Sequence, residues 1–375
     1  MVKLRRILAV LALLALCLSS CGQAEPAAPQ PEQDTHTVIG SMALQYAEQF
    51  AVDYYADGVA LVTIAGEERY LLVPEGVEAP EISDATVLHT PLDHLYLASS
   101  GAMDPFRQLD ALDSVRFTST TESDWSLPEV MDAMEAGGLL YAGKYRAPDY
   151  ELLLSEGCSF AIENTMILHS PATREELESL GIPTMVERSS YESHPLGRME
   201  WIKLYALLVG KEAEAEAFFE RQTAALGSIL GAESTGKTVA FFYLNPNGYV
   251  NVRRPGDYLS KMIELVDGVY VPAELAAEDN ALSTMNLQLE AFYAGAKDAD
   301  VLIYNSNIYP MGSIAQLIAA NELFADFKAV QSGEVWATEQ NLFQETSAVG
   351  GMIADFHAVL TGTAGDTLTY LHRLR

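Results

Sequence analysis

The 375-residue sequence has few basic residues. It has 22 Lys and Arg against 52 Asp and Glu, which gives a formal net charge of −30. A protein that binds nucleic acid by neutralising phosphates needs a basic surface, so this balance excludes that class. It also argues against a polybasic surface that docks on anionic lipids. We therefore expect no nucleic-acid partner.

Cysteine, histidine and the common catalytic motifs are also scarce. The three cysteines, Cys17, Cys21 and Cys158, cannot form a disulfide framework or a four-cysteine zinc site. None of the seven histidines forms a close pair suited to zinc. The sequence contains no Gly-x-Ser-x-Gly elbow. We expect no resident cofactor, no metal site and no catalysis.

The one long hydrophobic run is at the N-terminus. Three basic residues precede an apolar stretch over residues 7–18, which is followed by Ser19, Ser20 and Cys21. This order is typical of a secretory signal, and the stretch is shorter than the roughly 20 residues that span a bilayer. The run ending at Cys21 resembles the lipobox of bacterial lipoproteins, although an ordinary secretory signal fits too. We predict a signal peptide over residues 1–20, lipidation at Cys21 and an extracytoplasmic, membrane-anchored protein.

Two short segments precede the main folded part. Residues 21–37 are rich in Pro, Ala and Gln and lack aromatics, which predicts a flexible tether. Residues 50–73 alternate around Asp57-Gly58 and Gly66-Glu67, which predicts a small N-terminal β meander within residues 38–83. Its strands are expected over residues 50–55, 59–64 and 70–73.

From residue 84 onward, short apolar runs alternate with helical stretches, which favours parallel sheets with covered faces. The predicted strands of an N-terminal lobe over residues 84–210 are 86–89, 115–118, 139–141, 160–163 and 184–186. Its predicted helices are 91–99, 128–136, 149–155 and 173–180. A C-terminal lobe over residues 233–375 repeats the scheme with strands 239–244, 301–304 and 335–337, and with helices 258–266, 287–296, 314–319 and 350–360.

A single long helix is predicted between the lobes, over residues 211–232. Ala and Glu are good helix formers, and no Gly or Pro interrupts residues 211–226. An ordinary surface helix of one larger domain is the alternative. The predicted fold class is α/β, with two Rossmann-like lobes joined by this helix.

Several segments, taken in order, carry a family resemblance. They are residues 142–154, 160–163, 180–183, 195–203 and 327–336. Together they resemble the metal-chelate (siderophore, haem and cobalamin) substrate-binding proteins of ABC importers, which have the class III periplasmic-binding-protein fold with a rigid interlobe helix. The resemblance covers roughly residues 84–375. It departs from the family at His89-Thr90-Pro91, where the family has a Ser-Pro turn.

Tyr, Arg and Asn are common where the predicted strands end. Ligands of open parallel sheets bind beyond the carboxyl ends of the strands, and rings and guanidinium groups suit an apolar chelate with anionic edges. The predicted ligand-binding residues are Tyr145, Arg146, Glu163, Asn164, Tyr191, Asn245, Tyr249, Arg253, Arg254 and Tyr309. Two alternatives involve other residues: His169 or His194 could ligate haem iron, and Glu163 with Glu187 could form a carboxylate pair in a membrane-anchored hydrolase.

The resemblance implies a function without chemistry. A monomeric receptor would capture a ferric siderophore, or alternatively haem or a corrinoid, and deliver it to an ABC permease and its ATPase. Family members dock through one surface glutamate on each lobe. Glu151 matches the first position by its spacing to the following strand, and Glu290 is the best candidate for the second, although it lies about two residues farther from its strand than is usual in the family. The expected lobe motion is modest, because a stiff helix resists wide closure.

Overall fold

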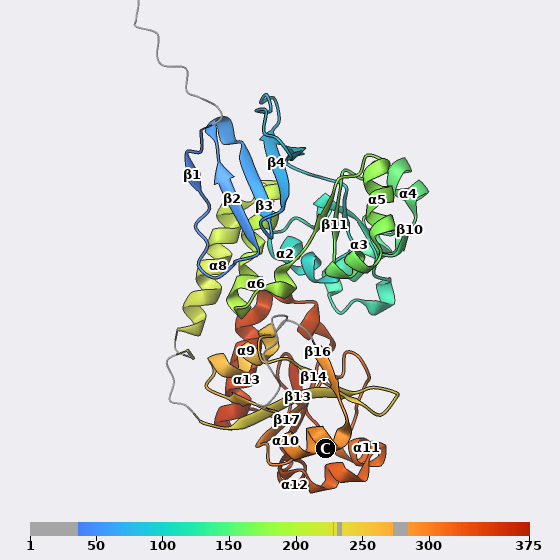
Figure 1. The fold of residues 1–375 in the computed structure, drawn as a ribbon, viewed down its shortest axis with the longest axis vertical. Coiled ribbons are helices and arrows are strands. Elements are labelled where there is room, and N and C mark those ends of the chain that lie inside the picture. Colours follow the sequence, from blue (N-terminus) through green and yellow to red (C-terminus); the bar gives the residue numbers. More distant parts are fainter. Residues whose placement is uncertain (1–36, 228, 231–234, 273–283) are drawn as a thin grey trace, which may run out of the picture.

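The computed structural model describes residues 37–227, 229–230, 235–272 and 284–375. The predicted signal peptide, Cys21 and the tether up to residue 36 lie outside these residues, as do parts of the stretch 211–232. The described chain forms an N-terminal sheet, an N-terminal lobe and a C-terminal lobe, with three helices packed between them (Figure 1).

The N-terminal sheet has five strands in the order β1-β2-β3-β4-β5. They are β1 (Gly40–Ser41), β2 (Phe50–Tyr54), β3 (Ala60–Ile64), β4 (Glu68–Pro74) and β5 (Thr86–Thr90). The three strands predicted for the meander are present as β2, β3 and β4. β5 pairs parallel to β4, so the prediction that residues 86–89 belong to the first lobe's sheet is wrong. Leu88 packs with Leu72 and Val62 in one cluster, and this apolar contact holds β5 on the N-terminal sheet.

The N-terminal lobe has a parallel sheet in the order β12-β11-β6-β7-β8. Its strands are β6 (Leu95–Leu97), β7 (Val115–Thr118), β8 (Leu140–Tyr141), β11 (Phe160–Glu163) and β12 (Thr184–Val186). A hairpin of β9 (Gly143–Lys144) and β10 (Ala147–Pro148) follows β8. The helices are α2 (Met103–Gln108), α3 (Pro128–Glu135), α4 (Tyr150–Ser155) and α5 (Pro171–Ser179). The predicted helix over 91–99 is wrong, since this stretch contains the central strand β6.

The C-terminal lobe has a mixed sheet in the order β16-β14-β13-β17-β18-β19, with β15 also paired to β13. Its strands are β13 (Thr238–Leu244), β14 (Val250–Arg253), β15 (Val269–Tyr270), β16 (Thr284–Leu287), β17 (Val301–Tyr304), β18 (Val335–Thr338) and β19 (Leu371–Arg373). The helices are α9 (Tyr258–Leu265), α10 (Leu289–Ala296), α11 (Ile314–Ala320), α12 (Lys328–Ser332) and α13 (Val349–Thr361). The expectation that residues 251–254 form a loop at a strand's carboxyl end is wrong, because β14 is an antiparallel hairpin partner of β13.

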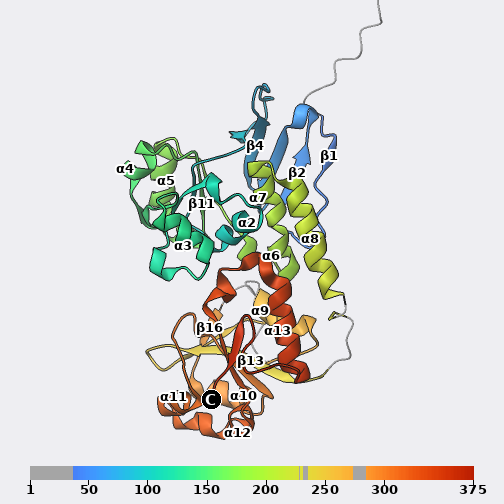
Figure 2. The same ribbon diagram turned by 180° about the vertical axis from the view of Figure 1, so that it is seen from behind.

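Three helices lie between the lobes: α6 (Pro195–Glu200), α7 (Ile202–Val209) and α8 (Glu212–Leu226). The predicted interlobe helix is α8. It packs on α7 and on α13 of the C-terminal lobe, as the view from behind shows (Figure 2). Ala215, Phe218 and Phe219 are its buried side, while the glutamates of its first turns are exposed. Helix α8 is therefore held against both lobes by apolar packing.

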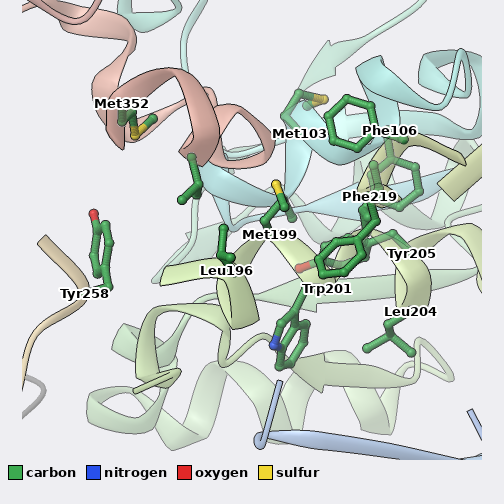
Figure 3. Close-up of a cluster of buried hydrophobic side chains, with 14 of the residues drawn as sticks. Met103, Phe106, Leu196, Met199, Trp201, Leu204, Tyr205, Phe219, Tyr258 and Met352 are labelled. Atoms are coloured by element: carbon green, nitrogen blue, oxygen red, sulfur yellow. The ribbon is translucent and has the colours of Figure 1, made fainter. Parts of the chain in front are cut away.

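One hydrophobic cluster runs continuously through both lobes. Figure 3 shows its central part, where side chains from α2, α6, α7, α8, α9 and α13 meet. Trp201 and Tyr205 have ring centroids 6.1 Å apart, and Phe106 lies 5.4 Å from Tyr205. Separate clusters cover the far face of each lobe's sheet. The lobes have distinct sheets but share this core, so wide rotation of one lobe against the other would expose apolar surface.

Two buried carboxylates fasten the segment that precedes β2. Glu200 accepts hydrogen bonds from the backbone N–H groups of Gln45, Tyr46 and Ala47, at 2.8–3.0 Å. Glu192 accepts the indole N–H of Trp201 at 2.7 Å, as well as the backbone N–H groups of residues 48 and 49. Both carboxylates belong to residues 192–200, which lead into and form α6. The N-terminal segment is therefore attached to the helices at the lobe junction.

A glycine and a lysine complete this fastening. A Cβ on Gly197 would lie 2.8 Å from the carbonyl oxygen of Tyr46, so a larger residue would push the segment away. Lys203 lies 3.2 Å from the Glu200 carboxylate and donates to the carbonyl of Ala43. These contacts give residues 195–203, one of the segments that carry the family resemblance, a structural role.

Candidate functional site

The carboxyl edges of the two lobes' parallel strands face each other. Gly101, just beyond the end of β6, accepts a 2.6 Å hydrogen bond from the hydroxyl of Thr346 in the C-terminal lobe. Thr346 follows the carboxyl end of β18 through a short 3-10 helix, Gln340–Phe343. Gln344 accepts two further bonds, from the N–H and hydroxyl of Ser126, at 2.7 Å each. The loops where ligands of such sheets bind are therefore brought together.

Tyr145 and Arg146 form the turn of the β9–β10 hairpin, beyond the end of β8. Tyr145 is half-buried against the outer cluster of the lobe, which includes Leu153 and Leu177. Arg146 is exposed, with its guanidinium carbon 5.8 Å from the Tyr145 ring centroid. The ring of Tyr145 is thus largely used by the packing of α4 and α5.

Glu163 ends β11 and is fully buried, and neither carboxylate oxygen has a hydrogen-bond partner among the described residues. Burial raises its pKa to about 8, so the carboxyl is largely protonated at neutral pH. The hydroxyl of Tyr96 on the neighbouring strand is also buried without a partner. Next in sequence, Asn164 caps the following 3-10 turn through Met166 and donates to the carbonyl of Ala98.

Glu187 directly follows β12, whose Val186 pairs with Glu163 in the sheet, so its side chain points to the other face. Glu163 follows Ala161 into the outer cluster, whereas Glu187 accepts a hydrogen bond from Ser99 at 3.2 Å and lies near Tyr205 in the main core. It also accepts the backbone N–H of Ser189 at 2.7 Å. This geometry gives no support to a carboxylate pair that shares one substrate.

Tyr191 belongs to the 3-10 turn Ser189–Tyr191, directly after β12, and is half-buried. The guanidinium carbon of Arg188 lies 6.0 Å from its ring centroid. This Arg–Tyr pair therefore lies at the carboxyl edge of the N-terminal lobe's sheet.

In the C-terminal lobe, Asn245 and Tyr249 bound the β13–β14 turn. The Asn245 side chain accepts the backbone N–H groups of Asn247 and Tyr249, both at 3.0 Å, and so shapes the turn. Tyr249 is 37 % exposed. Tyr309, in the loop after β17, is 39 % exposed and has its ring centroid 5.8 Å from that of Tyr243.

Arg253 and Arg254 lie where β14 returns toward the amino end of β13. Arg253 pairs with Asp257 at 3.3 Å, and its guanidinium carbon lies 5.4 Å from the ring centroid of Phe343. The backbone carbonyl of Arg254 accepts the hydroxyl of Ser260 in α9. The β14 hairpin therefore places both residues beside α9 instead of on a carboxyl-edge loop.

The two histidines proposed for haem iron differ in their surroundings. His194 stacks on Tyr46 with ring centroids 4.6 Å apart, and its Nδ1 accepts the N–H of Leu196. Burial lowers its pKa, which keeps the ring neutral. His169 is exposed at the end of the 3-10 turn Thr165–His169. Within the described ranges, no group of three or more His, Cys, Asp or Glu is placed to hold a metal ion.

The two glutamates predicted to dock on the permease are both exposed. Glu151 lies in the first turn of α4 and Glu290 in the first turn of α10, so each lobe carries one of them. Three surface hollows, of about 460, 360 and 360 Å³, contain none of the predicted ligand-binding residues. The candidate site therefore consists of the facing loops and not of one of these hollows.

Sequence reasoning missed other residues at this edge. Met166 and Leu168, after β11, are 51 % and 46 % exposed, and Ile308 stands next to Tyr309. Arg198 of α6 lies over the ring of Tyr258 from the C-terminal lobe, with its guanidinium carbon 4.3 Å from the centroid. The exposed apolar residues can be recognised in the sequence. The contact between Arg198 and Tyr258 joins residues 60 positions apart in different lobes, so no local sequence pattern predicts it.

Comparison with known proteins gives distant sequence relatives and a clear fold. No protein-family model matches the sequence. An uncharacterized lipoprotein of Methanocaldococcus jannaschii is 22 % identical over 358 residues, which cover 91 % of this chain and 89 % of the relative. A second lipoprotein of that organism is 24 % identical, over 59 % of this chain and 52 % of its own length.

Solved structures match most of the chain. A periplasmic binding protein from Veillonella parvula has a TM-score of 0.60 at 15 % identity, covering 84 % of this chain and 98 % of its own. A periplasmic haem-binding protein from Pseudomonas aeruginosa gives 0.59 at 14 %, covering 76 % and 98 %. A catecholate-siderophore binding protein from Vibrio cholerae gives 0.54 at 15 %, covering 71 % and 93 %. The chain therefore has the class III periplasmic-binding-protein fold, with two α/β lobes joined by a helix.

Proposed function

We propose that this protein is the extracytoplasmic substrate-binding lipoprotein of an ABC importer, and that it captures a ferric siderophore or a related metal chelate. The observation that carries the proposal is the fold, which matches nearly the full length of solved haem- and siderophore-binding proteins. The bound chelate would be passed unchanged to the permease, and the partner ATPase would supply the energy.

Exposed apolar and aromatic side chains support a ligand between the lobes. Met166 and Leu168 stand on the loop after β11, and Tyr249 and Tyr309 on the turns after β13 and β17. Large apolar groups that gather in solvent often mark a binding surface. Their flat and flexible surfaces suit the apolar body of a chelate.

Haem or a corrinoid is the alternative cargo for the same site. Haem is favoured by one observation: His169 is exposed on the rim of the N-terminal lobe. A hydrolase has less support, because Glu163 and Glu187 point to opposite faces of the sheet.

The proposed location and partners follow from the N-terminus and the two docking glutamates. Cys21 would carry the lipid anchor, in line with the resemblance to two lipoproteins. Within the described ranges, no helix has the length and apolar character needed to cross a bilayer. Glu151 and Glu290 would pair with arginines of the permease, with the receptor acting as a monomer.

The test is a ligand screen on the folded protein. Native mass spectrometry with a ferric tris-catecholate, a ferric hydroxamate, haem and cyanocobalamin should show one chelate bound per chain, with its mass unchanged. Tryptophan fluorescence should change on the same addition. Binding of none of the four, or conversion of one of them to a product, would refute the proposal.

A further inference from the structure

The loop over residues 187–194 is fastened at both ends by the N-terminal part of the chain. It follows β12 at the carboxyl edge of the N-terminal lobe, carries Tyr191 and leads into α6. Residues 37–74, which contain β1 to β4, form most of a sheet that lies beside this lobe (Figures 1 and 2). They lie before the stretch that carries the family resemblance, so the resemblance assigns them no role.

At the start of the loop, side chains of β4 hold strand β12. The hydroxyl of Tyr70 lies 2.8 Å from the carbonyl oxygen of Thr184 and 2.8 Å from the Glu68 carboxylate, so it can donate to either. Glu68 also accepts Nη1 of Arg174 at 2.8 Å and the backbone N–H of Val186 at 3.5 Å. Because β12 is the outermost strand of its sheet, these side chains occupy the place of a neighbouring strand.

At the end of the loop, the segment before β2 holds residues 192–194. The Glu192 carboxylate accepts the backbone N–H groups of residues 48 and 49, at 2.8 and 3.0 Å. The ring of His194 stacks on that of Tyr46, with centroids 4.6 Å apart. Both ends of the loop are therefore attached to residues 37–74.

Between these ends, the loop is held by its own hydrogen bonds and by Ser99 of the lobe. The N–H of Tyr191 donates to the carbonyl of Arg188 at 2.8 Å, and the N–H of Ser189 to the Glu187 carboxylate at 2.7 Å. The hydroxyl of Ser99 donates to Glu187 at 3.2 Å. These bonds shape the turn, whereas its place relative to the other loops of the candidate site depends on where its two ends are held.

We propose that residues 37–74 are a positioning element of the ligand site, with Tyr46, Glu68 and Tyr70 as its positioning residues. This inference rests on the proposed function and deepens it, because the affinity for the chelate then depends on a part of the chain outside the family resemblance. Each of the three residues acts through the loop 187–194. A loop that is fixed before binding loses less conformational freedom when the ligand arrives, so loosening either end weakens binding.

The test compares the chelate affinity of folded variants. Wild type is titrated by calorimetry with a ferric tris-catecholate, a ferric hydroxamate, haem and cyanocobalamin, and the chelate that it binds is used for all variants. Glu68→Ala and Tyr46→Leu should each lower that affinity at least threefold. Glu68→Gln keeps an acceptor for Arg174 and should recover part of the loss. Amide hydrogen exchange over residues 186–194 should accelerate in the first two variants.

Leu61→Ala is the matched control, because Leu61 is buried on the opposite face of the same sheet. It pairs with Leu71, the neighbour of Tyr70, and packs in a separate apolar cluster. This change should lower the melting temperature, because it removes a buried side chain, and should leave the affinity within twofold of wild type. All affinities are measured well below the lowest melting temperature.

Three outcomes would overturn the assignment. An affinity loss in Leu61→Ala equal to that in Glu68→Ala would show a general effect of destabilisation. Undiminished affinity in folded Glu68→Ala and Tyr46→Leu would show that the loop needs no such support. Both results leave the proposed function standing, whereas binding of none of the four chelates by wild type would overturn both. Should Glu68→Ala not fold, Tyr46→Leu decides.

Discussion

At the scale of single residues, Glu163 combines complete burial with two carboxylate oxygens that have no hydrogen-bond partner in the part of the chain that the structure describes. The hydroxyls of Tyr96 and Tyr150 and the thiol of Cys158 share its surroundings, and none of them offers it a positive charge. The folded pKa of about 8 lies above the ordinary value of 4.5. A carboxyl with a raised folded pKa makes the protein less stable as pH rises between the unfolded and the folded pKa, because in that range unfolding releases its proton.

The first prediction concerns this carboxyl. Relative to Glu163→Gln, wild type should lose stability as pH rises from about 4.5 to about 8, by up to about 1.4 kcal/mol per pH unit. Below about pH 4.5 and above about pH 8, the free energies of unfolding of wild type and Glu163→Gln should change with pH in parallel. Denaturant unfolding followed by tryptophan fluorescence between pH 4 and 9 measures the difference. A constant difference across the range would contradict the buried, uncharged state of Glu163.

For single residues, the sequence predicts which residue types lie near the candidate site better than it predicts what each of them contacts. Tyr249 and Tyr309 are exposed on carboxyl-edge turns, as a ligand-binding role requires. Arg253 forms an ion pair with Asp257, four residues further along the chain. The sequence contains both residues, but it does not indicate that they pair. Arg198 lies over the ring of Tyr258 in the other lobe, and no local sequence pattern predicts this contact.

At the scale of elements, the sequence predicts amphipathic helices and isolated buried strands well. The predicted strands 160–163, 184–186 and 301–304 match β11, β12 and β17 residue for residue. The error over residues 91–99 has a physical reason. β6 is buried on both faces, so it shows neither the alternation of a half-buried strand nor a helical period. The β14 hairpin was missed because its polar ends look like a loop.

The second prediction belongs to this scale and concerns the loop segment Gln344–Ser347, which connects the lobes. The side chain of Gln344 accepts both donors of Ser126 and donates to the carbonyl of Asp124, each at 2.7 Å. Gln344→Ala should destabilise the protein by about 1–3 kcal/mol, because the Ser126 N–H is left without its partner. Hydrogen exchange should accelerate over residues 121–127.

Gln340→Ala is the control for this change, since the Gln340 side chain is exposed. It should leave both stability and exchange near wild type. Unchanged exchange over residues 121–127 in Gln344→Ala would show that the lobes are held together by the apolar core alone.

At the scale of the whole molecule, the hydrophobic core shared by the two lobes and the connecting helix α8 favour small lobe motions. In the proposed function, ligand delivery then depends on the surfaces that would meet the permease. Glu151→Arg and Glu290→Arg should keep chelate affinity within about twofold and abolish uptake in vesicles that contain the permease and its ATPase. Exposed ion pairs are worth about 0–1 kcal/mol each, so charge reversal acts mainly by adding repulsion.

Glu220→Arg, on the exposed side of α8, is the matched control and should transport like wild type. Normal uptake with both Glu151→Arg and Glu290→Arg would remove these residues from the docking surface. Loss of chelate binding in either variant would instead indicate a defect in folding or in the site.

Residues 45–49 are hydrogen-bonded to Glu192 and Glu200, so they move with the folded part of the protein. The length of chain before them therefore limits the distance between the folded part and the proposed lipid anchor at Cys21. Sixteen residues, 21–36, separate Cys21 from the described chain. At about 3.3–3.6 Å per residue they reach at most about 50–60 Å, roughly one molecular diameter. Confinement to a hemisphere of that radius corresponds to a millimolar effective concentration at a neighbouring permease. A docking Kd in the millimolar range would therefore be enough to keep the proposed permease occupied. Such weak docking would let the receptor dissociate quickly once it has released its ligand.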